Sequence, residues 1–166
     1  MSAAPKLEVM NPLFDKRLIN AFVDGVIKTL KTMASTETIP GKPFIEPQFA
    51  VKGEIAGMVG IIAPPLQGTL MISYRQDSIL YIMENMMGEK HETIDREVAD
   101  AVGELTNMIY GSAKTTLNQL GYKFEMAIPT VISGNFTVSQ QHKGATLVIP
   151  FNLDNKSTFY VEITVQ

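Results

Sequence analysis

One stretch of the chain decides how it is expected to fold: Asp100-Ala-Val-Gly-Glu104-Leu-Thr-Asn107-Met-Ile-Tyr-Gly111-Ser-Ala-Lys114. Apolar residues recur at helical spacing through this stretch and its flanks, which predicts a long helix with one buried face. The residues expected on that face are Val98, Val102, Leu105, Ile109, Thr116 and Leu120. The same pattern predicts that the helix begins at Thr93 or Asp95 and stops at Gly121.

A polar stripe runs along the opposite face of the same helix. Its members are Asp100, Glu104, Asn107, Gly111, Lys114 and Asn118. Asparagine prefers helix caps and turns, and a glycine inside a helix costs about 1 kcal/mol relative to alanine. Asn107, Gly103 and Gly111 nevertheless lie mid-helix. We therefore predict that the polar stripe contacts a partner, and that Gly111 leaves room for the partner's backbone.

Two further helices are predicted from the same helical spacing. The first spans residues 12–34, with Asn11 as its N-cap and Pro12 at its first position. Its apolar residues recur in the way expected of an amphipathic helix packed on a core. The second is shorter, spans residues 76–87, and is expected to end at Gly88 as its C-cap.

The remaining chain is rich in branched and aromatic residues, which favours strands. The predicted strands cover residues 49–55, 58–63, 68–74, 124–132, 146–153 and 158–165. Residues 35–47 contain three prolines and are predicted to be a loop. In the last strand, alternation places Phe159 on one face of the sheet and Glu162 on the other. The predicted fold class is therefore α+β, an antiparallel sheet with two long helices and one short helix packed on it.

Length and composition limit what kind of protein this is. A chain of 166 residues suits one domain, predicted to span residues 12–166 after a loose tail of residues 1–11. The net charge of −3 and the lack of a basic cluster argue against nucleic acid as a partner. No apolar run approaches the roughly 20 residues of a membrane span, and no signal peptide is recognisable. We expect a cytoplasmic domain that does not bind membranes.

Several kinds of catalytic site are excluded by the residues present. The absence of cysteine removes disulfides, thiolate metal sites and cysteine nucleophiles. There is no glycine-rich phosphate loop and no Gly-x-Ser-x-Gly turn that would present a serine nucleophile. The two histidines, His91 and His142, lie among polar residues and are predicted to be surface side chains. The acidic residues of the long helix are predicted to be a solvated face rather than a metal site.

Glu104 and Asn107 remain as candidates for chemistry. A carboxamide donates and accepts hydrogen bonds at once, which suits Asn107 for holding a water in line with a phosphoryl group. The lysine and magnesium that stabilise the charge could then belong to a substrate protein. Glu104 would pair with that lysine and set the docking position. The alternative is a structural domain in which both residues are ordinary surface side chains.

The long helix resembles the signature helix of the CheC/CheX/FliY family of chemotaxis phosphatases. The shared core is Glu104-x-x-Asn107, preceded by the acidic Asp100 and followed by Gly111 and Ala113-Lys114. The resemblance extends to Gly68-Thr-Leu-Met-Ile-Ser, Met86-Met87-Gly88 and Ile128-Pro-Thr-Val-Ile-Ser-Gly134, and so covers most of residues 12–165.

This resemblance implies a substrate and a role for each site residue. Family members dephosphorylate the phospho-aspartate of CheY-like response regulators and so terminate a chemotaxis or two-component signal. Asn107 would orient the attacking water, and Glu104 would pair with the regulator's active-site lysine. Asp100, Gly111 and Lys114 are expected to contact the regulator. The magnesium would belong to the regulator, so no cofactor of the chain's own is expected.

The number of motifs distinguishes the branches of this family. The first helix, with Asp15-Lys-Arg-Leu-Ile-Asn20-Ala-Phe-Val-Asp24-Gly25, contains no Glu-x-x-Asn. A single motif is the CheX pattern, which implies a homodimer whose second subunit carries the second site. An alternative function is a non-catalytic binding module that docks a response regulator or a component of the flagellar switch.

Overall fold

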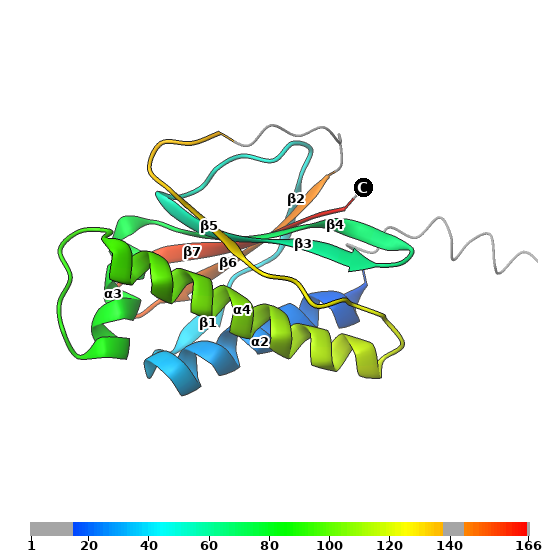
Figure 1. Cartoon of the computed structure of the whole chain (residues 1–166), viewed down its shortest axis with the longest axis horizontal. Helices are drawn as coiled ribbons and strands as arrows, with labels where there is room; N and C mark the ends of the chain where they lie inside the picture. Colours follow the sequence, from blue (N-terminus) through cyan, green and yellow to red (C-terminus); the bar gives the residue numbers. More distant parts are fainter. Residues whose placement is uncertain (1–14, 138–144, 166) are drawn as a thin grey trace, which may run out of the picture.

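The architecture is an antiparallel sheet covered on one face by helices (Figure 1), as seen in a computed structural model that describes residues 15–137 and 145–165. The described strands are β1 (Thr38–Pro40), β2 (Phe44–Glu46), β3 (Ile55–Ala63), β4 (Leu66–Tyr74), β5 (Thr130–Ser133), β6 (Thr146–Leu153) and β7 (Thr158–Val165). The sheet order is β1-β6-β7-β4-β3-β5, with β2 also pairing with β6. The predicted α+β fold class is confirmed. The predicted tail, residues 1–11, lies outside the described residues, and the extent of the domain stays a prediction.

Both predicted hairpins are present because each joins neighbours in sequence, although β3 and β4 begin at Ile55 and Leu66 rather than at the predicted residues 58 and 68. Strands β3 and β4 pair from Ile55↔Tyr74 to Ala63↔Leu66 around a tight turn, and β6 and β7 pair from Thr146↔Thr164 to Asn152↔Thr158. Strands β6 and β7 have the predicted bounds. Alternation along these strands points every second side chain at the helices, where Phe159, Val161 and Ile163 are fully buried.

Three further predictions about the strands are wrong. The predicted loop of residues 35–47 contains β1 and β2, two three-residue strands that pair with β6 at the edge of the sheet. Proline is tolerated there because an edge strand has backbone groups without a ladder partner. Residues 49–54 are irregular rather than a strand, and the predicted strand of residues 124–132 is reduced to β5.

The helices are α2 (Lys16–Ala34), α3 (Gln76–Met87) and α4 (Arg96–Gln119). The predicted N-cap Asn11 and first residue Pro12 lie outside the described residues. The predicted start at residue 12 is wrong, because the helix begins after Asp15, whose carboxylate accepts from Arg17 N–H at 2.9 Å. The Arg17 side chain, hydrogen-bonded to Asp15, lowers the pKa of that carboxyl to about 2, and Tyr122 acts in the same direction. Helix α3 has the predicted bounds and ends at Gly88, whose φ of 74° favours glycine.

The long central helix α4 begins after Asp95, whose side chain accepts from Val98 N–H at 3.0 Å. Four residues of its predicted buried face are fully buried: Val98, Val102, Leu105 and Ile109. The prediction fails in the last two turns, where Thr116 and Leu120 are exposed while Ala113 and Leu117 are buried. At 3.6 residues per turn, the face continues from Ile109 in steps of four.

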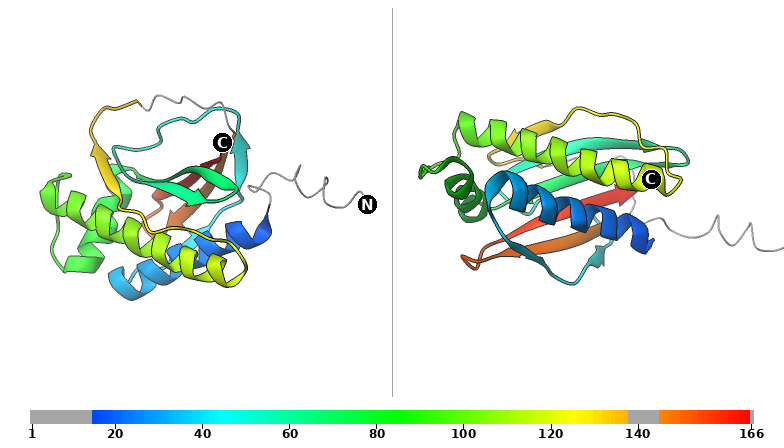
Figure 2. Two further views of the ribbon diagram at one scale, coloured as in Figure 1. Left: turned by 45° about the vertical axis from the view of Figure 1, so that its right-hand side comes forward. Right: turned by 90° about the horizontal axis from the view of Figure 1, so that it is seen from below.

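Helices α2 and α4 lie antiparallel on the same face of the sheet (Figures 1 and 2). The start of α2 meets the chain just after α4, where Tyr122 Oη donates to Asp15 at 2.7 Å. Midway along, Gly25 of α2 allows close approach: a Cβ there would lie 3.2 Å from the Ile109 carbonyl oxygen. This pairing brings residues of α2 alongside the turn of α4 that carries Asn107.

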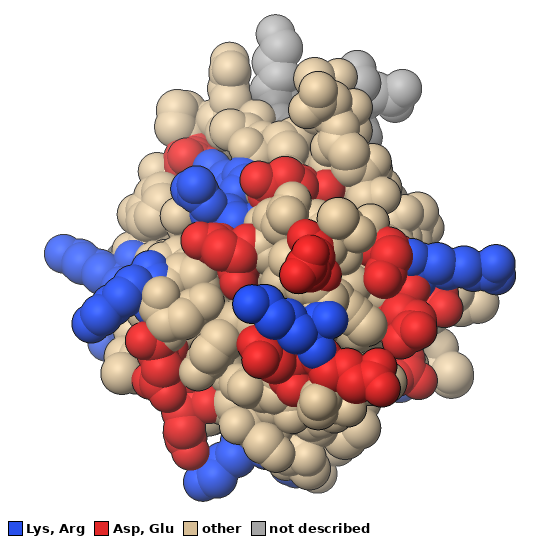
Figure 3. Space-filling view, turned by 90° about the vertical axis from the view of Figure 1, so that its left-hand side faces the viewer, with Lys and Arg blue, Asp and Glu red and all other residues tan. Residues whose placement is uncertain are grey.

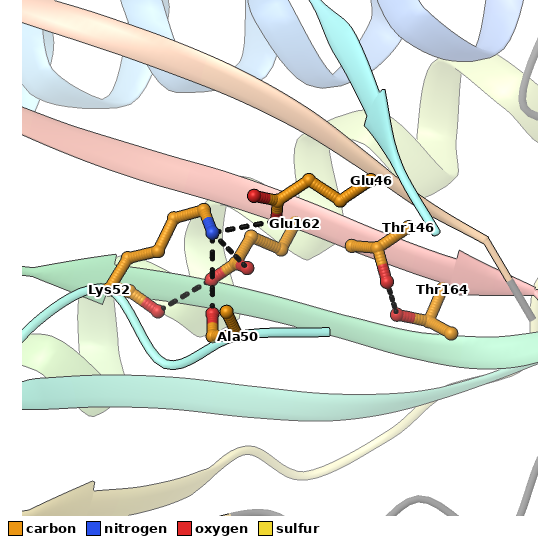
Figure 4. A network of polar contacts seen from close by, with 7 residues as sticks. Glu46, Ala50, Lys52, Thr146, Glu162 and Thr164 are labelled. Carbon is orange, nitrogen blue, oxygen red and sulfur yellow. Dashed lines mark hydrogen bonds and ion pairs between the residues drawn. The ribbon is translucent and has the colours of Figure 1, made fainter. Parts of the chain in front are cut away.

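The other face of the sheet carries a buried carboxylate. Glu162 points to the face of the sheet opposite to that of Phe159, as predicted. Its side chain is buried there because the irregular segment after β2 covers it (Figure 4). Ser73 Oγ donates to Glu162 at 3.0 Å, and Lys52 Nζ lies 3.8 Å from Glu162 and 2.6 Å from Glu46. Burial raises the pKa of Glu162 from 4.5 to about 7, although Ser73 and Lys52 lower it.

This buried carboxylate should make stability fall as the pH rises. The folded pKa of about 7 lies above the ordinary value of 4.5, so folding disfavours the ionised form. The free energy of unfolding should therefore fall by about 3 kcal/mol between those two values and stay level above them. We expect Glu162→Gln to flatten this dependence, as measured by urea unfolding at pH 5 and pH 8. The exposed Glu37→Gln should keep the wild-type slope, and an equal slope in both variants would contradict the assignment.

Candidate active site

The exposed face of α4 carries the candidate site. Asp100, Glu104 and Asn107 are exposed, and Gly111 and Lys114 are half-buried. These five residues lie on one face of α4 because they follow one another in steps of four and three residues. In the described part of the chain, no other residue engages the carboxylate of Glu104 or the amide of Asn107 through a side-chain hydrogen bond or ion pair. Both groups are therefore presented to solvent.

The last member of the polar stripe has a structural task instead. Asn118 accepts from Phe124 N–H at 2.7 Å, and its Nδ2 donates to the Phe124 carbonyl at 3.2 Å. About two turns earlier on α4, Tyr110 Oη donates to the Glu125 carbonyl at 2.6 Å. Burial raises the pKa of Tyr110, which keeps the phenol protonated as a donor. With the bond from Glu125 N–H to the Ile62 carbonyl of β3 at 3.0 Å, these bonds hold the backbone at Phe124 and Glu125, and residues 124–129 form no regular strand.

Helix α4 is seated on the sheet one residue away from Asn107. Thr106 is fully buried, and its Oγ1 donates to the Val102 carbonyl at 2.7 Å. Its side chain packs against Gly57 of β3 so closely that a Cβ on Gly57 would overlap Thr106. Sequence reasoning missed both residues. A glycine inside a strand is a signal of close approach, but the segment that approaches cannot be read from the sequence.

The two mid-helix glycines of α4 serve different purposes. A Cβ on Gly103 would lie 3.3 Å from Val131 Cγ2, so Gly103 lets β5 pack against the helix. A Cβ on Gly111 would meet nothing within 4 Å. Gly111 therefore leaves open space on the exposed face, which fits the predicted close approach of a partner.

Carboxylates predominate at the end of the molecule where α4 begins, with a few lysines and arginines between them (Figure 3). Among the described residues, no three His, Cys, Asp or Glu side chains are grouped so that they could hold a metal ion.

The prediction that His91 is a surface side chain is wrong, because its side chain is only 8% exposed and lies 3.6 Å from Glu97. His142 lies outside the described residues. Within residues 15–137 and 145–165, none of the helices has the length and apolarity needed to cross a membrane.

Comparison with known proteins identifies relatives over most of the chain. The family model for chemotaxis phosphatase CheX matches residues 55–152. A CheC-like superfamily protein from Shewanella sp. PV-4 is 42% identical, with a TM-score of 0.82 over 95% of this chain and 99% of that one. The CheY-P phosphatase CheX of Thermotoga maritima is 26% identical over 153 residues, which are 92% of this chain and 97% of the relative.

A further solved structure contains a partner protein. It is the CheX-CheY-BeF3-Mg+2 complex from Borrelia burgdorferi, whose matching chain is 26% identical with a TM-score of 0.74. The match covers 89% of this chain and 97% of that one. The three helices and the antiparallel sheet are thus shared with chains of the CheX and CheC type.

Proposed function

We propose that this chain, which belongs to the CheX family of chemotaxis phosphatases, dephosphorylates the phospho-aspartate of a CheY-like response regulator. Membership makes the protein a phosphatase, and hence a hydrolase. The activity named for the Thermotoga relative and the CheY in the Borrelia complex support a response regulator as the substrate. The observation that carries the proposal is the free, exposed pair Glu104 and Asn107 on a helix fixed to the sheet beside them.

Asn107 is proposed to position the attacking water. Its side-chain oxygen accepts a hydrogen bond from the water, and its amide group is free to donate. The water attacks phosphorus in line with the aspartyl oxygen, the P–O bond to the aspartate breaks, and the products are the free carboxylate and inorganic phosphate. Alignment of the water supplies much of the rate enhancement in such a reaction, since little covalent chemistry is required of the enzyme.

Glu104 is proposed to fix the position of the regulator by pairing with its active-site lysine. An ion pair with a geometric constraint contributes to docking specificity and to the association rate. The magnesium that neutralises the phosphoryl charge belongs to the regulator in this proposal. Asp100 and Lys114 are proposed as contacts at the rim, each contributing no more than about 1 kcal/mol, as is typical of ion pairs at a protein surface. The cytoplasm, where response regulators act, is the proposed location.

The direct test of the proposal is release of inorganic phosphate from a magnesium-loaded, phosphorylated CheY-like regulator. We expect the wild-type protein to shorten the lifetime of the phospho-regulator in proportion to its concentration. A non-catalytic binding module would bind the regulator saturably and leave that lifetime unchanged. A structural domain would do neither. The exposed, unengaged Asn107 favours the enzyme, because a module that only binds does not require a water-orienting amide at this position.

Neutralising Glu104 should weaken docking and leave turnover largely intact. We expect Glu104→Gln to raise KM about 10-fold, which corresponds to about 1.4 kcal/mol, with kcat within about threefold. The matched control is Glu89→Gln, an exposed carboxylate outside α4. Steady-state phosphate release at a range of regulator concentrations separates the two constants. An unchanged KM in Glu104→Gln would remove Glu104 from the proposed interface.

The proposed homodimer has a candidate surface at the β5 edge of the sheet. Strand β5 pairs with β3 on one side, and no described strand pairs with its other side. The segment leading into β5 makes a hydrogen bond to β3, in which Glu125 N–H donates to the Ile62 carbonyl. On this segment Met126 and Ile128 are 88% and 90% exposed. An unpaired edge with exposed apolar side chains is suited to pairing with a second copy.

Light scattering in solution tests this dimer. We expect the wild-type protein to have the mass of two chains and Ile128→Lys to have the mass of one, since a lysine on a strand edge opposes pairing. The control is Ile39→Lys at the opposite edge of the sheet, where Ile39 is also exposed. If Ile39→Lys dissociates the dimer and Ile128→Lys does not, the β5 edge is the wrong surface.

A further inference from the structure

A groove runs between α2 and α4 beside the candidate site. It has a volume of about 370 Å³, and Gly111 belongs both to its lining and to the polar stripe. From α4, Met108 and Thr115 also line it, and from α2, Lys28 and Thr32. Met108 is 37% exposed, so the groove combines one accessible apolar side chain with hydroxyls and a cation.

The antiparallel packing of the two helices explains why α2 reaches this position. Asp15 meets Tyr122 at one end, and Gly25 meets Ile109 in the middle, so later residues of α2 face earlier residues of α4. The residues of α4 that line the groove with Lys28 and Thr32 run from Met108, which follows Asn107 directly, to Thr116, and they include Gly111 of the polar stripe. The groove is therefore continuous with the proposed catalytic face, although α2 itself lacks the Glu-x-x-Asn motif.

We propose that this groove receives part of the response regulator whose phosphoryl group Asn107 attacks, and that Lys28 and Thr32 of α2 belong to the docking surface. The proposal rests on the proposed function. A standard protein interface covers about 800 Å² on each partner, a disc of roughly 16 Å radius. Thr115 lies only about 12 Å along the helix from Asn107 at 1.5 Å per residue. A regulator centred on Asn107 therefore covers the groove.

The charge of the groove fits the same occupant. A phospho-aspartyl site that holds magnesium presents carboxylates and a phosphoryl group, which together attract a cation. Lys28 is exposed on the rim of the groove, while Glu104 and Asp100 on α4 are anionic. With Lys28 the docking surface offers both signs of charge, so α2 attracts the acidic surroundings of the phosphoryl group and Glu104 meets the lysine. Complementarity of this kind determines the choice of regulator more than the rate of chemistry.

Binding of a magnesium- and beryllofluoride-loaded CheY-like regulator, measured by titration calorimetry, tests the proposal. We expect Lys28→Glu to raise Kd about 10-fold and Thr32→Trp, which fills the groove, to raise it at least as much. The matched controls are Lys31→Glu and Lys31→Trp, which introduce the same side chains at an exposed position of α2 outside the groove. Both controls should bind within about twofold of wild type.

Turnover distinguishes failure of this proposal from failure of the proposed function. In phosphate release with saturating phospho-regulator, Lys28→Glu should retain kcat within about threefold, because Lys28 contacts the partner and not the water. If Lys28→Glu and Thr32→Trp bind as tightly as their controls while the wild-type protein is active, the groove is not part of the interface. If the wild-type protein binds the regulator without releasing phosphate, the proposed function is overturned while the groove variants still report on docking.

Discussion

Asn107→Ala is expected to lower kcat for phospho-regulator hydrolysis by about 100- to 1000-fold, the loss typical of removing one preorganised polar group from a transition state. The amide is exposed and unengaged in the described part of the chain, so its removal should not disturb the fold. Regulator binding should change little, because Glu104 and the rest of the surface remain. Phosphate release under saturating regulator measures kcat, and calorimetry measures Kd.

The matched control for Asn107 is Gln119→Ala, which removes an exposed carboxamide from the last turn of the same helix. Gln119→Ala should retain wild-type kcat. If Asn107→Ala hydrolyses the phospho-regulator as fast as this control, the amide does not position the water, and the assignment of the catalytic residue is wrong. If Asn107→Ala loses binding and turnover in parallel, Asn107 acts in docking rather than in chemistry.

Gly57→Val is expected to lower the free energy of unfolding by about 3 kcal/mol, because the new side chain would occupy space that Thr106 fills. Gly60→Val on the same strand is the control, since a Cβ at Gly60 meets nothing within 4 Å. Valine favours strands, so the control should be neutral or slightly stabilising. Urea unfolding of both variants measures the difference. Equal stability of the two would show that α4 is not seated on Gly57.

A second variant separates a local clash from a general loss of stability. Thr106→Ala removes the atoms that a side chain at position 57 would meet first, so Gly57→Val combined with Thr106→Ala should recover part of the lost stability. Thr106 directly precedes Asn107, so Gly57→Val should also displace the proposed catalytic face. We expect its kcat to fall even in conditions where the variant is folded, as monitored by circular dichroism.

Elements that depend on neighbours in sequence were predicted closely. Helix α3 and strands β6 and β7 have their predicted bounds, because capping and alternation are local properties. Helix α4 was also predicted, but the wrong residues were assigned to its buried face in the last two turns. The short strands β1 and β2 were missed because they exist only through pairing with β6, at least 100 residues away in sequence. The predicted strand does not form over residues 124–129, whose backbone is bound by the side chains of Tyr110 and Asn118 and by a bond from Glu125 to β3.

The candidate site, like the fold, was predicted where it depends on residues close in sequence. The polar stripe with Glu104 and Asn107 could be identified from sequence, because one helix carries both residues at fixed spacing. The sequence also showed that Asn107 and Gly111 lower the intrinsic stability of the helix, which pointed to a function for them. Their catalytic and docking roles remain proposals that the turnover and binding experiments decide.

The sequence by itself determined which residues share the exposed face of α4, since helical periodicity alone relates positions a few residues apart. Only the tertiary structure decided what surrounds that face. The seating of Thr106 on Gly57, the groove that Lys28 and Thr32 complete, and the burial of Glu162 beneath Lys52 all join segments far apart in the chain. Such contacts depend on how a sheet and its helices pack, and no local pattern of residues encodes the partner in a contact of this kind.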